Sequence, residues 1–200
     1  MFLLMLLYLL TKNNPKEVCG YHTSLFGKWH VGSNIKKLPN YQGSDYFWGT
    51  QEGTNAAGYT VTPQWDPMVA TTPYIYEGVK GQYANKVKLF DMPAKITLDS
   101  DITERAIANI KKQAKTGKPF FSYIGFTHFH PPWTVHDKFR NASKAGIYAD
   151  TQMEVDYNIG RILKAIEYDG ITDNTVVILT GDNGAGNFPQ GSALAAGEDG

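Results

Sequence analysis

Two residues near the start of this 200-residue chain have the chemistry to bind and protonate an oxyanion. The segment GYHTSLFGKWHVG at residues 20–32 places Lys28 two positions before His30 in a predicted strand. Alternate side chains of an extended segment share a face, so we expect Lys28 and His30 on one side and Trp29 on the other. An ammonium beside an imidazole can neutralise the oxygens of a sulfate or phosphate and move a proton near neutral pH. A surface lysine and a half-buried histidine beside a core tryptophan are the alternative interpretation.

Two further histidines follow the apolar segment PFFSYIGF at residues 119–126. His128 and His130 in THFHPP lie where this predicted strand ends, and the carboxyl edge of a parallel sheet is the usual place for ligands. A rigid, Pro-bounded loop with solvated histidines is the alternative. The spacing also occurs at metal sites, but a single cysteine and no matching histidine pair do not support a zinc site.

Two oxygen donors follow a second apolar segment, TVVILTG at residues 175–181. Asp182 and Asn183 are hard ligands that suit Ca²⁺ or Mg²⁺ at the end of a buried strand. Asn-Gly is also a strong hairpin signal, but the preceding strand does not alternate and AGNFPQGSA is a poor second strand. The pattern therefore favours a metal site.

The apolar pattern predicts the elements that position these candidates. Asp101 and Glu104 resemble a capping box that opens a helix, which Gly117 ends. A second helix is expected at residues 149–168. Continuous apolar runs predict strands covered on both faces, and residues 33–98 predict loops and short strands. This order of elements predicts an α/β layered fold with a mostly parallel sheet. The expected inner side of the second helix consists of Met153, Tyr157, Ile159, Ile162, Leu163 and Ile166.

Composition limits the kind of partner and the compartment. Nineteen basic residues balance nineteen acidic ones, so no global field favours nucleic acid or an anionic membrane. One cysteine, Cys19, excludes an internal disulfide. The run MFLLMLLYLL at residues 1–10 is too short to span a bilayer and suits the apolar core of a secretory signal. A buried helix or a misplaced start codon are the alternatives, since no basic residue precedes the run and no cleavage motif follows it.

Taken together, these segments resemble the sulfatase family, in the alkaline-phosphatase-like superfamily of metal-dependent hydrolases. Residues 20–32 are similar to the signature G-Y-x-T-x-x-x-G-K-W-H-x-G, and PFFSYIGFTHFHPPW resembles the family's middle strand and histidine loop. DYNIGRILKAIEYDGITDNTVVILTGDNG is similar to its helix, followed by G-x-x-D-N-T and D-N-G. The resemblance implies an α/β fold with helices on both faces of the sheet, truncated here at both ends. It also implies an arylsulfatase-like sulfuric ester hydrolase acting on an aryl or carbohydrate sulfate.

The resemblance assigns a role to each candidate residue. Lys28 would bind the sulfate, and His30 would hydrogen-bond the nucleophile and help break the enzyme-sulfate intermediate. His130, rather than His128, would contact the sulfate and assist the leaving oxygen. Asp182 and Asn183 would supply part of a Ca²⁺ site, with Mg²⁺ as the other candidate. The expected partner is a sulfate ester, either a small molecule or a glycan, and the expected location is secreted, periplasmic or lysosomal.

Several family features are missing from the 200 residues. The family makes its formylglycine cofactor from the cysteine of a C-x-P-S-R motif, and Cys19 lacks the proline and arginine and lies too close to Lys28. No acidic residue precedes Glu17, where the family has paired aspartates, and no lysine follows Lys164. We therefore interpret residues 16–200 as part of a sulfatase catalytic domain, preceded by an apolar segment at residues 1–15. The 200-residue chain by itself is expected to be inactive as a sulfatase.

Two other functions fit the same residues. A phosphodiesterase or phosphonate hydrolase of the same superfamily also uses a lysine, a histidine and a divalent metal. A catalytically inactive module would still bind sulfated glycans through Lys28, His30 and His130. The sequence does not indicate an oligomeric state.

Overall fold

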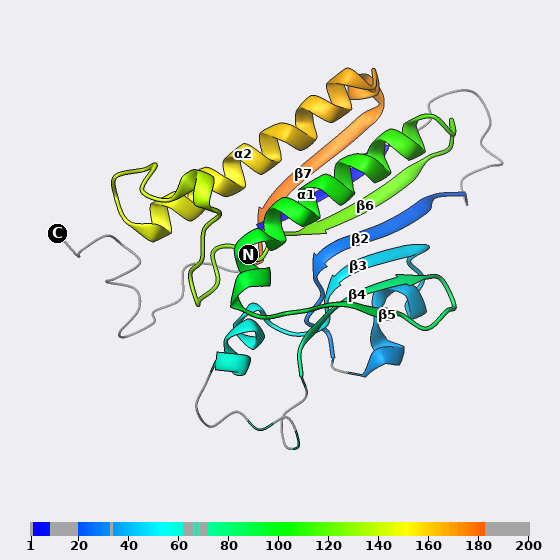
Figure 1. The fold of residues 1–200 in the computed structure, drawn as a ribbon. Helices are drawn as coiled ribbons and strands as arrows, with labels where there is room; N and C mark the ends of the chain where they lie inside the picture. The colour runs from blue at the N-terminus through cyan, green and yellow to red at the C-terminus, as the bar shows by residue number, and fades with distance from the viewer. Residues whose placement is uncertain are drawn as a thin grey trace.

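The computed structural model describes residues 20–32, 34–61, 66, 68 and 72–182, together with the backbone of residues 2–8. A seven-stranded sheet has the order β5-β4-β3-β2-β6-β1-β7 (Figure 1). Its strands are β1 (Phe2–Tyr8), β2 (His22–Lys28), β3 (Tyr46–Thr50), β4 (Tyr74–Val79), β5 (Asn85–Leu89), β6 (Phe120–Gly125) and β7 (Thr175–Gly181). The α-helices are α1 (Met92–Ala114) and α2 (Ile147–Tyr168). Short 3₁₀ helices are η1 (Ile35–Lys37), η2 (Pro39–Tyr41), η3 (Thr54–Val61), η4 (Asp137–Phe139) and η5 (Thr172–Asn174).

The predicted α/β class is confirmed, but the prediction of a mostly parallel sheet is wrong, because the described sheet is mixed in direction. β2 pairs in parallel with β3 and with β6, whereas the pairs β1–β6, β1–β7, β3–β4 and β4–β5 are antiparallel. The connection between β4 and β5, residues 80–84, is a short turn, and a parallel crossover needs a dozen residues or more. Both parallel pairs of the described sheet involve β2, the strand that ends at Lys28.

The apolar N-terminal segment forms a strand within the sheet. β1 lies between β6 and β7, with Leu4 opposite Ile124 on one side and Leu179 on the other. The alternative of a buried helix at this segment is therefore wrong, and the secretory signal stays a prediction. No described helix has the length and apolar character that crossing a membrane requires.

The main hydrophobic core lies between the sheet and the two α-helices, which cover the same face (Figure 1). On the opposite face, η1 and η2 cover β2, β3 and β4 through a second cluster, so helical cover there comes from 3₁₀ turns in the described residues. Side chains of the main core include Phe26, Trp48, Ile75, Leu98, Ile102, Ala106, Ile110, Phe120, Ile124, Val155 and Ile162.

The first helix begins earlier than the capping-box pattern predicts. α1 starts at Met92, where the Asp91 carboxylate accepts a hydrogen bond from the Ala94 backbone N–H at 2.8 Å and Pro93 occupies the first turn. Asp101 lies within the helix and accepts from Thr97 Oγ1 at 3.4 Å. The predicted start at Asp101 is therefore wrong, because a residue pair with cap spacing also occurs in a helix interior.

Two predictions of burial are wrong. β7, predicted to be buried, is exposed in the described structure, with Val176 at 43% and Leu179 at 50%, and it is the last strand in the sheet order. On α2, Met153, Tyr157 and Leu163 are each 43% exposed, whereas Ile162 and Ile166 are buried as predicted. The buried stripe of α2 is partly polar instead: Thr151, Glu154, Val155, Asn158, Ile162, Ala165 and Ile166.

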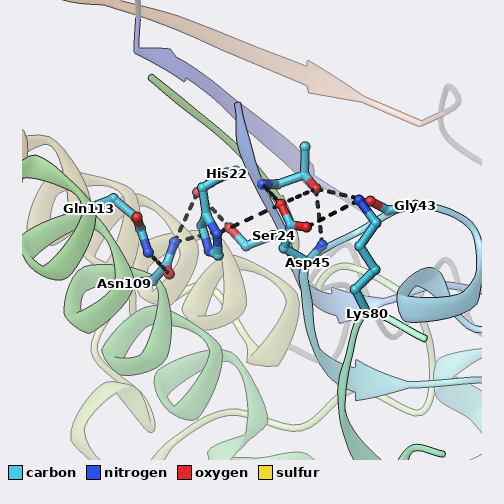
Figure 2. Close-up of polar contacts among 9 residues, drawn as sticks. His22, Ser24, Gly43, Asp45, Lys80, Asn109 and Gln113 are labelled. Atoms are coloured by element: carbon cyan, nitrogen blue, oxygen red, sulfur yellow. Dashed lines mark hydrogen bonds and ion pairs between the residues drawn. The ribbon is translucent and has the colours of Figure 1, made fainter. Parts of the chain in front are cut away.

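A polar network fixes the start of β2 against both α1 and the loop before β3 (Figure 2). Asn109 of α1 donates to Ser24 Oγ at 3.0 Å, and Ser24 Oγ lies 2.9 Å from Ser122 Oγ of β6. Asp45 accepts from the Thr23 backbone N–H at 2.9 Å and pairs with Lys80 at 3.3 Å. These contacts hold the register of β2, and hence the place where Lys28 emerges at its other end.

Replacing Asp91 with alanine should destabilise the protein by about 1 kcal/mol, because the Ala94 N–H loses its acceptor at the helix start. Asp101→Ala should cost less than about 0.5 kcal/mol, since Asp101 caps no helix end. Urea unfolding followed by far-UV circular dichroism measures both. Equal losses in the two variants would contradict the observed helix start.

Candidate functional site

Three glycines in neighbouring strands bring the strand ends of the site close together. Gly27 of β2 lies opposite Gly49 of β3 and Gly125 of β6. A Cβ at Gly27 would lie 2.0 Å from the Gly125 carbonyl oxygen, and a Cβ at Gly49 would lie 1.9 Å from that of Gly27. Gly27 also has φ of +99°, in the region that favours glycine. Lys28 follows directly, so its position depends on a backbone approach that only glycine allows.

Lys28 is a buried ammonium at the end of β2, with 6% of its surface exposed. Burial lowers the pKa of Lys28, and the carboxylate of Asp182 opposes that shift. Asp182 follows β7, so the ends of β2 and β7 place opposite charges within electrostatic range. A buried cation of this kind attracts an anion more strongly than a solvated lysine does, because less water screens it.

His130 lies in the loop after β6 and has a defined ring orientation. Its Nδ1 lies 2.7 Å from the Pro131 carbonyl oxygen, so Nδ1 carries the proton and donates it there. Burial lowers the pKa of His130, the Pro131 carbonyl raises it, and the charges of Lys28 and Lys95 lower it. A neutral His130 therefore has the Nε2 lone pair available to accept a proton near neutral pH.

His30 departs from the extended geometry on which its expected direction depends. Its φ is +54°, and its backbone N–H donates to the Gln51 carbonyl at 3.1 Å. The ring is exposed and lies against Gly53. Alternation holds as far as Trp29, which packs in the cluster opposite the α-helices and donates from Nε1 to the Lys37 carbonyl at 2.9 Å. We expected Lys28 and His30 to share one face because both would lie in an extended strand. His30 is not extended, so strand geometry no longer supports that expectation.

The predicted metal ligands are only partly within the described structure. Asp182 is exposed at the end of β7, and Asn183 lies outside the described residues, as does Cys19. Within the described residues, no group of three or more histidine, cysteine or acidic side chains is arranged to hold a metal ion. Asp182 alone is not a complete Ca²⁺ site, because calcium takes six to eight oxygen ligands.

A buried charged cluster beneath the site was not predicted from the sequence. It consists of Lys95 and Asp99 on α1, His128 after β6, and Glu154 on α2, each 1% exposed. The solvated-histidine interpretation is therefore wrong for His128, whose Nε2 lies 3.3 Å from Glu154 Oε2. The spacing of Lys95 and Asp99, four residues apart, is the sequence signal that a correct helix start would have revealed.

Comparisons with known proteins agree with the motif pattern. A family model described as Sulfatase matches residues 18–199. Arylsulfatase G of Mus musculus is 28% identical over 177 residues, which cover 82% of this chain and 34% of that protein. N-acetylgalactosamine-6-sulfatase of Canis lupus familiaris is 26% identical over 173 residues, which cover 83% of this chain and 31% of that protein. The chain thus spans about a third of the length of these relatives.

Two solved structures have a fold similar to that of this chain. The crystal structure of the PsFucS1 sulfatase from Pseudoalteromonas sp. matches with a TM-score of 0.69 and 25% identity, over 78% of this chain and 34% of that one. Ps i-CgsB in complex with k-i-k-neocarrahexaose matches with a TM-score of 0.57 and 19% identity, over 78% and 36%. The second likeness concerns the fold alone.

The buried ammonium of Lys95 should make stability depend on pH. Burial lowers the pKa of Lys95 to about 8 from an ordinary value of 10.5, although Asp99 and Glu154 raise it. Between these two values the unfolded chain binds more protons than the folded one, so unfolding becomes less favourable as pH rises. Relative to Lys95→Met, the wild type should gain up to about 3 kcal/mol between pH ~7 and ~10. Urea unfolding across that range measures the gain.

Lys112→Met, which removes an exposed lysine of the same helix, is the matched control and should show no such trend. A constant difference between the wild type and Lys95→Met across the pH range would mean that Lys95 is not desolvated.

Proposed function

Because this chain belongs to the sulfatase family, we propose that it forms the sulfate-holding side of a sulfuric ester hydrolase site. The observation that carries the proposal is the buried Lys28 ammonium at the end of β2, within electrostatic range of His130 and Asp182. An ammonium can bind the anionic oxygens of a sulfate ester, and an imidazole can transfer a proton during its cleavage. The substrate class is an aryl or carbohydrate sulfate, in keeping with the names of the relatives.

In this proposal each residue has a distinct task. Lys28 neutralises non-bridging oxygens of the sulfate group as charge builds up on them. His130, with its Nδ1–H held by the Pro131 carbonyl, donates a proton from Nε2 to the leaving oxygen once that nitrogen is protonated beside the bound anion. His30 is assigned to the nucleophile by resemblance to the family. Its exposed position beside Gly53 leaves the ring accessible to a group supplied from outside the described residues.

Asp182 and Asn183 are proposed to contribute to a Ca²⁺ or Mg²⁺ site, with further ligands from elsewhere. Bound there, the metal would supply positive charge beside the reacting group. The described donors do not complete such a site, so no step is derived through it.

The formylglycine of the family has no candidate cysteine motif in these residues. We also propose that residues 16–200 belong to one catalytic domain and that the protein acts in an extracytoplasmic compartment.

The chain should bind inorganic sulfate at the proposed site. Sulfate added to isotope-labelled protein should shift the ring resonances of His130, and Lys28→Met should weaken the affinity by about tenfold or more, as expected for a lost charged hydrogen bond. Lys36→Met removes an exposed lysine of η1 and is the control, with unchanged affinity. The proposal fails if sulfate leaves His130 unaffected, or if both lysine variants bind it equally.

The 200-residue polypeptide should not turn over para-nitrophenyl sulfate, because it has no C-x-P-S-R motif to supply the nucleophile. The measurement is release of para-nitrophenolate above the uncatalysed rate. Turnover that Lys28→Met abolishes would contradict this expectation and would mean that another group acts as nucleophile. Hydrolysis of a para-nitrophenyl phosphodiester without binding of sulfate would favour the phosphodiesterase alternative instead.

A further inference from the structure

The loop that carries His130 is attached to α1 by one buried carboxylate. Asp99 Oδ1 accepts hydrogen bonds from the Thr127 backbone N–H and from Thr127 Oγ1, both at 2.8 Å. Asp99 Oδ2 accepts from the His128 backbone N–H at 3.1 Å. Both oxygens of Asp99 are thus directed at the second and third residues after β6. A buried carboxylate that accepts several N–H and O–H groups fixes the backbone it contacts.

A second buried carboxylate attaches the same loop to α2. Glu154 Oε2 accepts from the His136 backbone N–H at 2.9 Å and lies 3.3 Å from His128 Nε2. The His128 ring also lies 3.8 Å from Asp99 Oδ2, so it bridges the two carboxylates. The loop is therefore fixed near both its ends, and His130 lies between the two attachments.

The buried carboxylates have a counter-charge that also acts on the site. Lys95 is 1% exposed, its ammonium interacts electrostatically with Asp99 and Glu154, and its charge reaches Lys28 and His130. Two carboxylates without such a cation would be costly to bury. The cluster is thus a buried part of the fold beneath the histidine loop, and its charges are shielded from solvent.

We propose that Asp99 and Glu154 are positioning residues for His130. They do not touch the oxyanion; they fix residues 127–136 so that the His130 ring stays within reach of the charge of Lys28. The inference rests on the proposed function, since it assigns the fixed histidine to a sulfate site.

Two sets of variants test the proposal by NMR titration with inorganic sulfate. Asp99→Asn leaves one acceptor oxygen for three donors, so the His130 ring resonances should shift without sulfate and the sulfate affinity should fall at least about tenfold. Glu104→Gln makes the same carboxylate-to-amide change at an exposed position of α1 and should change neither.

Glu154 provides a series that separates positioning from general stability. Glu154→Gln should keep affinity within about threefold, because an amide oxygen in the place of Oε2 can still accept from the His136 N–H and from His128 Nε2. The amide nitrogen then takes the place of Oε1, which has no hydrogen-bond partner within the described structure. Glu154→Ala loses both contacts and should weaken sulfate binding at least about tenfold. If Asp99→Asn does not fold, the Glu154 series decides.

Unchanged His130 resonances and unchanged sulfate affinity in folded Asp99→Asn or Glu154→Ala would overturn the proposal, whatever their loss of stability. Equal affinities in Glu154→Gln and Glu154→Ala would do the same. If sulfate does not bind the wild type, the proposed function fails. The His130 resonances of the variants without sulfate then still decide whether the carboxylates position the ring.

Discussion

The parallel pairing of β2 with β6 is the constraint on which the site depends. Two parallel strands end at the same edge of a sheet, so Lys28 and the loop after β6 emerge side by side. The pairing reaches that edge through Gly27 and Gly125, where a side chain on Gly27 would collide with the facing carbonyl. The polar contacts at the other end of β2 fix its register from Ser24 onward. A slip of one residue would turn Lys28 to the opposite face.

The same edge of the sheet determines the protonation state of its histidine. Burial and the two lysine charges lower the pKa of His130, which favours the neutral ring while no anion is bound. An oxyanion bound beside Lys28 offsets those positive charges and raises the pKa of His130 again. Binding of the anion therefore favours protonation of Nε2, which gives the ring a proton to donate to the leaving oxygen in the proposed reaction. The chemistry of Lys28 and His130 is coupled through charge, without direct contact.

The sequence predicts the elements whose apolar pattern is continuous or periodic. The strands at residues 119–126 and 175–181 and the helix at residues 149–168 agree with β6, β7 and α2 to within two residues. The burial of β7 was predicted wrongly, because exposure of its side chains depends on which elements cover its two faces and not on its own residues. The direction of β1 also depends on tertiary pairing. Family motifs located Lys28 and His130, whereas the left-handed backbone of His30 leaves no mark in the sequence.

The sequence did not predict the buried charged cluster for a more general reason. Asp99 and Glu154 are of residue types that are rarely buried, and the loop that they contact explains their burial. Asp99 accepts mainly from backbone N–H groups, so its effect on the loop does not require particular side chains there. Glu154 instead contacts the ring of His128. The shape of the histidine loop is therefore specified from two helices beneath it, which places much of the information for the site outside the motif that identifies it.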